Sequence, residues 1–115
     1  MPVRSLHTSV LKWPDAGTVG AAVRQWAREM RRDRPEVIRL GYFGSYARGD
    51  WGVGSDLDLV IVVSSAEEPF ERRGARWPTT DLPVPTDVLV YTDEEWQRLA
   101  PGRFGQTVIR EAVWL

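Results

Sequence analysis

The sequence predicts a fold of the α+β class, with helices and β-strands sharing one small domain. Apolar residues recur at three- and four-residue steps between Val19 and Met30, a spacing typical of an amphipathic helix. Further along, Leu57 to Val63 is an apolar run interrupted only by Asp58, as expected for a buried strand. A chain of 115 residues is long enough for one hydrophobic core but not for a separate substrate domain, so we treat residues 1–115 as one domain.

The composition excludes several classes of function. The chain has 15 basic and 16 acidic residues and a net charge of −1, which gives no electrostatic reason to expect a nucleic-acid or membrane partner. The absence of cysteine excludes disulfides, thiolate metal sites and cysteine nucleophiles. No segment resembles a signal peptide, and the longest apolar run is too short to span a bilayer, so we expect a cytoplasmic location.

The first helix has recognisable ends. Residues 1–14 have no clear period and are predicted to form an N-terminal arm. Asp15 or Thr18 can cap the helix that follows, and Pro35 lies just past its end.

Three strands are predicted after this helix. The first covers Glu36–Phe43 and ends at a Gly-Ser turn, after which Tyr46–Gly49 is long enough for one helical turn. A glycine-rich loop leads to the second strand, Ser55–Val63. The third, Thr86–Tyr91, is indicated by its β-branched and aromatic residues.

The remaining segments favour helices. Glu67–Trp77 is a helix candidate weakened by Pro69 and Gly74. Thr92 followed by Glu95 has the spacing of a capping box at the start of another helix. A last helical face is predicted from Phe104, Val108, Ile109 and Ala112, followed by the apolar run Val113–Leu115.

Two aspartates open the second predicted strand. Side chains at positions i and i+2 of a strand lie on the same face, so Asp56 and Asp58 are expected to project side by side. Two adjacent carboxylates repel each other, and a divalent cation is the usual partner that stabilises them. The pair therefore predicts a site for one or two Mg²⁺ ions at the start of a central strand.

A glycine-serine turn, Gly44-Ser45, precedes this strand. Backbone N–H groups where a turn opens a helix can bind an anion, and glycine lets a phosphate come close. The Ser45 hydroxyl adds one more donor. The turn is therefore a candidate phosphate site.

A third carboxylate is expected from a later strand. Asp87 can complete a second metal site or act as general base for an attacking hydroxyl. Asp81 and Asp93 are its rivals, but they fall in a predicted loop and a predicted helix cap, so strand context favours Asp87. A phosphate site, divalent metals and a positioned nucleophile are the parts that nucleotidyl transfer requires.

The same residues resemble the signature of the DNA polymerase β-like nucleotidyltransferase superfamily. The resemblance rests on Gly-Ser-Tyr-Ala-Arg-Gly at Gly44–Gly49, on Ser-Asp-Leu-Asp-Leu at Ser55–Leu59, and on the spacing between them. It covers the region from Glu36 to Tyr91. The short chain is similar to the minimal nucleotidyltransferase branch, whose members are often paired with a helical HEPN protein.

The resemblance implies a mixed β-sheet flanked by α-helices, the palm-like fold of polymerase β. It also implies Mg²⁺-dependent transfer of a nucleotidyl group, most often AMP from ATP. In toxin–antitoxin members this domain is the antitoxin and modifies a tyrosine of the HEPN toxin. Arg48 matches an arginine of the family, with a structural or a phosphate-contacting role. The site residues implied are Asp56, Asp58 and Asp87 for metals and catalysis, and Gly44, Ser45 and Arg48 for the nucleotide.

Three functions stay open at this stage. The first is a Mg²⁺-dependent nucleotidyltransferase that uses ATP or another NTP, favoured because Ser45 occurs together with the aspartates. The second is an antitoxin that neutralises a HEPN partner mainly by binding it, favoured by the short chain and the apolar tail Val113–Leu115. The third is a transferase for small, antibiotic-like molecules, whose acceptor pocket would require a homodimer.

Overall fold

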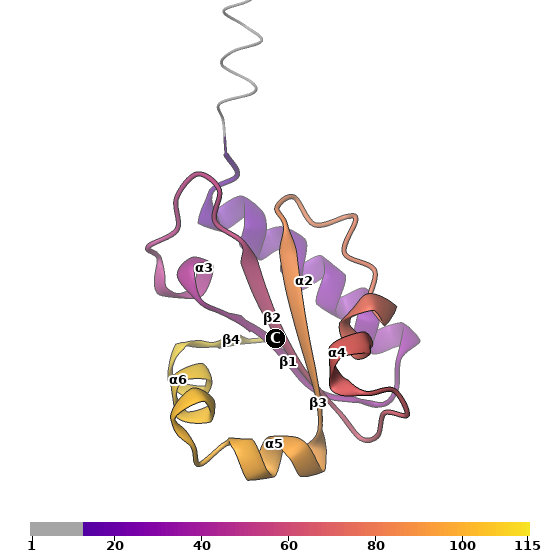
Figure 1. Cartoon of the computed structure of the whole chain (residues 1–115). Helices are drawn as coiled ribbons and strands as arrows, with labels where there is room; N and C mark the ends of the chain where they lie inside the picture. Colours follow the sequence, from indigo (N-terminus) through magenta and orange to yellow (C-terminus); the bar gives the residue numbers. More distant parts are fainter. Residues whose placement is uncertain (1–12) are drawn as a thin grey trace, which may run out of the picture.

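The centre of the molecule is a four-stranded β-sheet (Figure 1). Its strands are β1 (Val37–Phe43), β2 (Leu57–Val63), β3 (Thr86–Thr92) and β4 (Val113–Trp114). Their order across the sheet is β3-β2-β1-β4; β1 is antiparallel to β2 and β4, whereas β2 and β3 are parallel. This confirms the mixed sheet and the α+β class. The structure, a computed structural model, describes residues 13–115, so all but the last two residues of the predicted arm lie outside the described part.

A long helix, α2 (Ala16–Asp33), covers one face of the sheet. Asp15 caps it, because its Oδ1 accepts a hydrogen bond from the Thr18 N–H at 2.8 Å, which decides between the two predicted caps. The buried stripe of α2 packs on alternate, fully buried residues of β2. Burial of each large apolar side chain contributes roughly 1.5–3 kcal/mol to the stability of the fold. The contacting residues include Val19, Val23, Trp26, Ala27 and Met30 of the helix, and Leu57, Leu59 and Ile61 of the strand.

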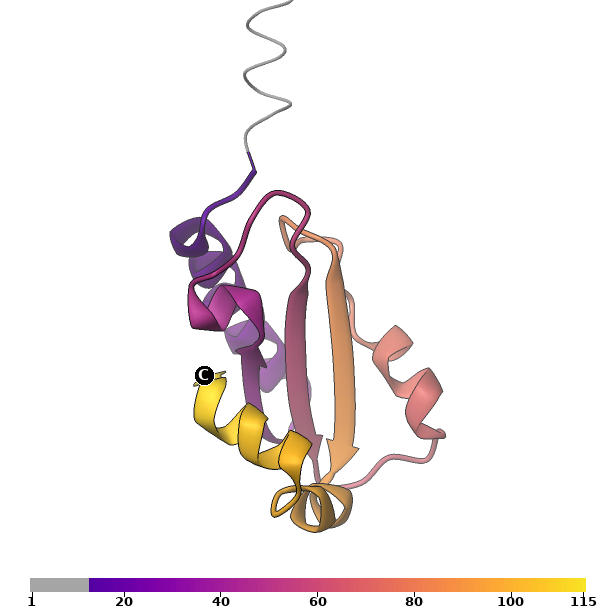
Figure 2. The same ribbon diagram turned by 60° about the vertical axis from the view of Figure 1, so that its left-hand side comes forward.

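The opposite face of the sheet is covered by two short helices, α5 (Asp93–Leu99) and α6 (Arg103–Glu111). A second apolar cluster joins them to the sheet, and its buried members are Val60, Val62, Trp96 and Val108. Figure 2 shows both helices against one end of the sheet, the end at which β2 and β3 finish. At the other end, where these two strands begin, α6 still contacts the sheet and its surroundings through Phe104 and Glu111.

The connection from β2 to β3 follows the outer edge of β3. The single helix predicted over Glu67–Trp77 is wrong: two short pieces replace it. Pro69 precedes the first piece, and Gly74 packs so closely on β3 that a Cβ there would lie 2.7 Å from the Val88 carbonyl oxygen. The two pieces are α4 (Phe70–Arg73) and the 3₁₀ helix η1 (Gly74–Arg76).

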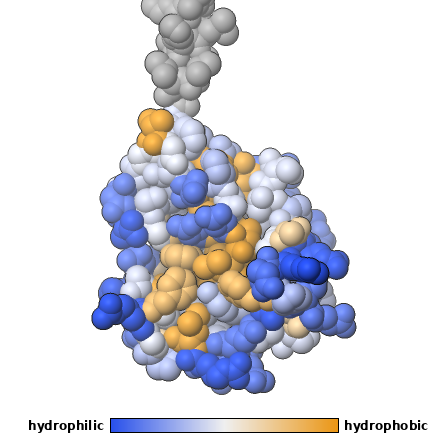
Figure 3. Space-filling model, viewed as in Figure 1, coloured by the Kyte–Doolittle hydropathy of each residue, from blue (hydrophilic) through white to orange (hydrophobic). Residues whose placement is uncertain are grey.

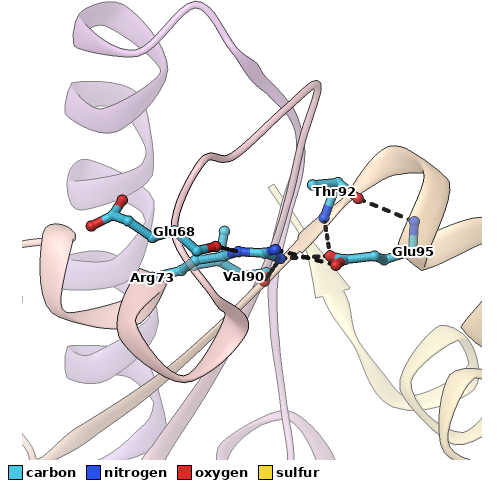
Figure 4. Close-up of polar contacts among 5 residues, drawn as sticks. All are labelled: Glu68, Arg73, Val90, Thr92 and Glu95. Carbon is cyan, nitrogen blue, oxygen red and sulfur yellow. Dashed lines mark hydrogen bonds and ion pairs between the residues drawn. The ribbon is translucent and has the colours of Figure 1, made fainter.

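Arg73 ties this connection to β3 and α5 (Figure 4). Its buried guanidinium donates to the Glu68 and Val90 carbonyl oxygens at 2.8 and 3.2 Å, and to both Glu95 carboxylate oxygens at 2.5 and 3.2 Å. Glu95 also accepts from the Thr92 N–H, while the Thr92 hydroxyl accepts from the Glu95 N–H, so the predicted capping box is confirmed. Arg73, together with the Thr92 N–H, lowers the pKa of Glu95 to about 2.

The end of the chain completes the sheet. The predicted last helix is present as α6, but the run Val113–Leu115, which we expected to favour a partner, forms β4 and pairs with β1. The Leu115 N–H donates to the Leu40 carbonyl oxygen at 2.8 Å, and Gly41 leaves room for Trp114, whose Cε3 would lie 2.8 Å from a Cβ at that position. The apolar tail is therefore used within the chain.

Across residues 13–115, the structure contains no helix with the length and apolar character needed to cross a membrane.

Candidate active site

Two aspartates from neighbouring strands lie in register where β2 and β3 begin. Asp58 and Asp87 are the second residues of their strands, and the parallel pairing sets them opposite each other. Because Leu57 and Leu59 pack towards α2, strand alternation directs Asp58 to the opposite face. The structure thus brings together two of the three predicted carboxylates, on the open end of that face.

Gly44 lies against Asp58. Its backbone has φ +80° and ψ −154°, a conformation that glycine alone adopts readily, and a Cβ at this position would collide with Asp58 Oδ2. The preceding residue, Phe43, is the antiparallel partner of Asp58. The predicted phosphate turn therefore adjoins the carboxylate pair directly.

The charge of Asp58 is disfavoured in the free protein. Burial raises the pKa of its half-buried carboxyl, and the negative charges of Asp87 and Asp56 raise that pKa further. The positive charge of Arg48 acts in the opposite direction. A cation bound between these carboxylates would offset the repulsion, so the donor set suits a hard divalent metal.

The helical turn α3 (Ser45–Arg48) begins immediately after Gly44. The N–H groups of Ala47 and Arg48 bond to the Gly44 carbonyl oxygen at 3.0 and 2.9 Å. The N–H groups of Ser45 and Tyr46 precede them at the open start of the turn, where a helix has no acceptor of its own for them. The phosphate turn itself stays a prediction.

Tyr46 has a packing role. Its side chain is buried, its hydroxyl accepts a hydrogen bond from Trp13 Nε1 at 2.7 Å, and its ring stacks on Trp51 at 5.6 Å between centroids. Trp13, placed by the sequence in the N-terminal arm, is therefore part of the packing around α3. Because the Tyr46 ring is buried and stacked on Trp51, it is not available to stack on a nucleobase.

Arg48 is held by two carboxylates. Its Nε donates to Asp50 at 3.0 Å and its Nη1 to Glu111 at 3.2 Å. These ion pairs show that Arg48 has a structural role in the free protein, and its phosphate-contacting role stays a prediction. Glu111 was missed in the sequence, although a carboxylate in the last turn of a helix, where the helix dipole disfavours it, is a signal that a cation lies nearby.

Asp56 lies just outside the strand. The predicted start at Ser55 is wrong because Ser55 closes a turn with Gly52: its N–H donates to the Gly52 carbonyl oxygen at 3.0 Å and its Oγ accepts from the Gly52 N–H at 2.8 Å. The strand begins only at Leu57, so strand alternation does not fix the direction of the exposed Asp56 side chain. Among residues 13–115, no group of three or more histidine, aspartate or glutamate side chains is already arranged to hold a metal ion.

The two rivals of Asp87 lie elsewhere. Asp81 is exposed on a turn before β3. Asp93 follows the far end of β3, six residues after Asp87, which corresponds to about 20 Å along a strand. Its carboxylate accepts a hydrogen bond from Gln97 at 3.0 Å and belongs to the start of α5. Asp87 is therefore the acid that shares an end of the sheet with Asp58.

The surface around the carboxylates combines polar and apolar parts. Figure 3 shows this face of the molecule, with apolar surface gathered in the middle and hydrophilic surface around it. Phe43, the antiparallel partner of Asp58, meets the partly exposed Phe104 of α6 edge-on, with 5.9 Å between ring centroids. A substrate with a charged phosphate portion and a flat apolar portion matches such a surface.

A pocket of about 400 Å³ lies at the other end of the sheet. Its lining includes Arg34, Arg73 and Arg76, but each of these arginines already has a partner within the chain: the Arg76 carbonyl oxygen, Glu95 and Glu68 respectively. We therefore place the candidate active site at the Asp58 end of the sheet and not in this pocket.

Comparisons with known proteins identify the family of the chain. The family model described as "Nucleotidyltransferase domain" matches residues 23–108. A search of curated proteins gives no match. Among solved structures, a candidate nucleotidyltransferase from Sulfolobus solfataricus superposes with a TM-score of 0.61 at 20% identity, over 86% of this chain and 80% of that one.

Toxin–antitoxin structures also share the fold. A crystal structure of a toxin–antitoxin MntA-HpeT mutant has a TM-score of 0.57 at 19% identity, with 80% of this chain and 69% of that chain covered. A toxin–antitoxin structure with AMP-PNP has a TM-score of 0.55 at 18% identity, over 76% and 67% of the two chains. The family match includes Gly44, Asp58 and Asp87, and the chain belongs to the nucleotidyltransferase domain family.

Proposed function

We propose that this nucleotidyltransferase transfers a nucleoside monophosphate, AMP from ATP in the first instance, to a hydroxyl group. The observation that carries the proposal is the register of Asp58 with Asp87, directly beside the Gly44 turn. Two acids and a phosphate turn at one end of a sheet meet the needs of phosphoryl chemistry, which depends on positioning and charge stabilisation.

The residues divide into two groups by role. Gly44 and Ser45 would receive the phosphates through backbone N–H groups and the serine hydroxyl. Asp58, Asp87 and Asp56 would hold Mg²⁺, with Asp56 turning towards the pair from the loop before β2. Bound Mg²⁺ would neutralise the triphosphate and stabilise the leaving pyrophosphate.

Asp87 is also the proposed base. The acceptor oxygen forms a bond to the α-phosphorus, the bond from that phosphorus to the bridging oxygen breaks, and pyrophosphate leaves. The proton of the acceptor hydroxyl passes to the Asp87 carboxylate, which is exposed to solvent and so can release it afterwards.

The acceptor we favour is a hydroxyl on a HEPN-type partner protein, within a toxin–antitoxin pair in the cytoplasm. The fold shared with the MntA-HpeT and AMP-PNP toxin–antitoxin structures supports it. Because the apolar tail Val113–Leu115 is used within the sheet, it no longer favours a partner protein. The support for a partner rests on those structures and on the open carboxylate face. An antitoxin that acts mainly by binding is the second candidate, and a homodimeric transferase for small molecules ranks third.

The test is calorimetric titration of ATP, GTP, CTP and UTP into the purified protein, with Mg²⁺ and with EDTA. We expect one nucleotide to bind only with Mg²⁺, and Asp58→Asn to weaken binding and transfer by about 100-fold or more. The apoprotein of this variant should melt no lower than wild type, because the substitution removes a disfavoured charge.

Asp81→Asn is the matched control, since Asp81 is an exposed acid on a turn before the same strand. It should bind nucleotide as wild type does. Metal-independent binding, or equal effects of the two substitutions, would contradict the proposed site, whereas binding without transfer to any partner would favour the antitoxin that acts by binding alone.

A further inference from the structure

Glu111 connects the end of α6 to the proposed phosphate turn. Its carboxylate accepts a hydrogen bond from Arg48 Nη1 at 3.2 Å, across 63 residues of sequence. Figure 2 shows α3 next to the C-terminal end of α6, where Glu111 is the last helical residue. The helix dipole disfavours a carboxylate at that position, so helix stability alone does not explain why a glutamate occurs there. The ion pair with Arg48 does explain it.

The two carboxylates around Arg48 differ in how firmly they are held. The Asp50 side chain is 62% exposed in a loop, whereas that of Glu111 is 19% exposed. The main chain after Glu111 is fixed as well, because the Ala112 N–H bonds to Val108 and β4 pairs with β1. Glu111 is therefore the anchored partner and Asp50 the one that solvent can replace.

Arg48 itself lies within one helical turn of the contact between Gly44 and Asp58. Its N–H donates to the Gly44 carbonyl oxygen at 2.9 Å. Its bonds to Asp50 and Glu111 use Nε and Nη1, and within residues 13–115 none involves Nη2. The guanidinium can therefore keep Glu111 and still donate to a phosphate through Nη2.

We propose that Glu111 is a positioning residue that holds the Arg48 guanidinium beside the Gly44 turn, so that Arg48 contacts the nucleotide triphosphate while Asp50 gives way. This inference rests on the proposed function, because it requires a triphosphate at that turn. By fixing Glu111, α6 and β4 would contribute to nucleotide binding as well as packing against the sheet.

The experiment measures the Kd of Mg²⁺–ATP, or of whichever NTP binds most tightly, together with the Tm of each apoprotein. Glu111→Gln should weaken binding by about tenfold, as is typical when a supporting carboxylate is lost. Asp50→Asn, which removes the exposed acid from the same guanidinium, should change Kd by no more than about twofold.

A charge exchange separates positioning from simple stabilisation. The double variant Arg48→Glu with Glu111→Arg restores an ion pair of reversed polarity and should recover the Tm lost in Arg48→Glu. Nucleotide binding should stay lost, because a carboxylate now faces the phosphates. Recovery of both Tm and Kd, or a Glu111→Gln variant that binds as wild type does, would overturn the inference; failure of wild type to bind any Mg²⁺–NTP would overturn the proposed function instead.

Discussion

At the scale of single residues, one contact constrains both the fold and the site. Gly44 must lie against Asp58 for the first two strands to pair with the proposed phosphate turn between them. Its positive φ and the absence of space for a Cβ are two independent reasons for glycine. The same closeness would set a phosphate and a metal-binding carboxylate within reach of one another.

We expect Gly44→Ala to lower the free energy of unfolding by about 2 kcal/mol or more, because the new methyl group displaces Asp58 and the backbone conformation is strained. Mg²⁺-dependent nucleotide binding should be lost with it. The measurements are urea unfolding and calorimetric titration.

Gly52→Ala is the control, since a Cβ at Gly52 would meet no atom within 4 Å and its φ is not positive. It should leave stability unchanged or raise it by up to about 1 kcal/mol. A Gly44→Ala variant as stable as Gly52→Ala would show that Asp58 can move aside freely.

At the scale of the elements, the network around Arg73 holds the connection between β2 and β3 in place. The buried guanidinium satisfies a carbonyl group of the edge strand β3 and pairs with Glu95 at the start of α5. An edge strand with unpaired carbonyl groups is open to pairing with other chains, so this contact also protects that edge.

The pH dependence of stability should reveal the network. The pKa of Glu95 is lowered from 4.5 to about 2, so its contribution is complete above its ordinary value and is lost as the pH falls from there through about 2. The carboxylate is 32% exposed, and with allowance for solvent screening we expect Glu95→Gln to cost about 2 kcal/mol at pH 7. The cost should shrink at pH 3, as measured by urea unfolding at both values.

The matched control is Glu94→Gln, which breaks an exposed pair with Arg98 in the same helix. Exposed pairs of this kind contribute about 0.5 kcal/mol or less. Equal losses for the two variants, or a loss for Glu95→Gln that does not vary with pH, would contradict the role given to Arg73.

Elements with a strong local signal could be predicted from sequence, and those defined by distant contacts could not. The continuous apolar run of β2 and the caps Asp15 and Thr92 depend on neighbouring residues, and the structure has them as expected. The two-residue strand β4 exists only through pairing with β1, so no local pattern marks it.

The same limit applies to the site. The Gly-Ser turn and Asp58 belong to one short motif that can be read directly. The match of Asp58 to Asp87 depends on the register of two strands, and the pair Arg48–Glu111 joins residues 63 positions apart. Asp56 was expected on the same strand face as Asp58 because the strand was predicted to start at Ser55, but Ser55 closes a turn with Gly52 and the strand starts at Leu57.

At the scale of the whole molecule, the free protein carries a repulsion that its ligand would remove. Nucleotide with Mg²⁺ should therefore stabilise the folded state by mass action, by about 2.7 kcal/mol at a concentration 100 times Kd. Thermal unfolding with Mg²⁺ alone, with ATP and EDTA, and with both should raise the Tm clearly only in the last case. A similar rise with ATP and EDTA would contradict a site built on carboxylates.

The parallel pairing of β2 with β3 also determines when the site comes into being during folding. The antiparallel pair β1–β2 is linked by the shorter connection, Gly44–Asp56, whereas β3 can reach β2 only after Ser64–Pro85 has closed a longer crossover. A chain emerging from the ribosome therefore has the proposed phosphate turn and Asp58 before Asp87 can join them. We expect the nucleotide site to be among the last features to mature, which pulse-labelled hydrogen exchange during refolding would detect as late protection of the β3 amides.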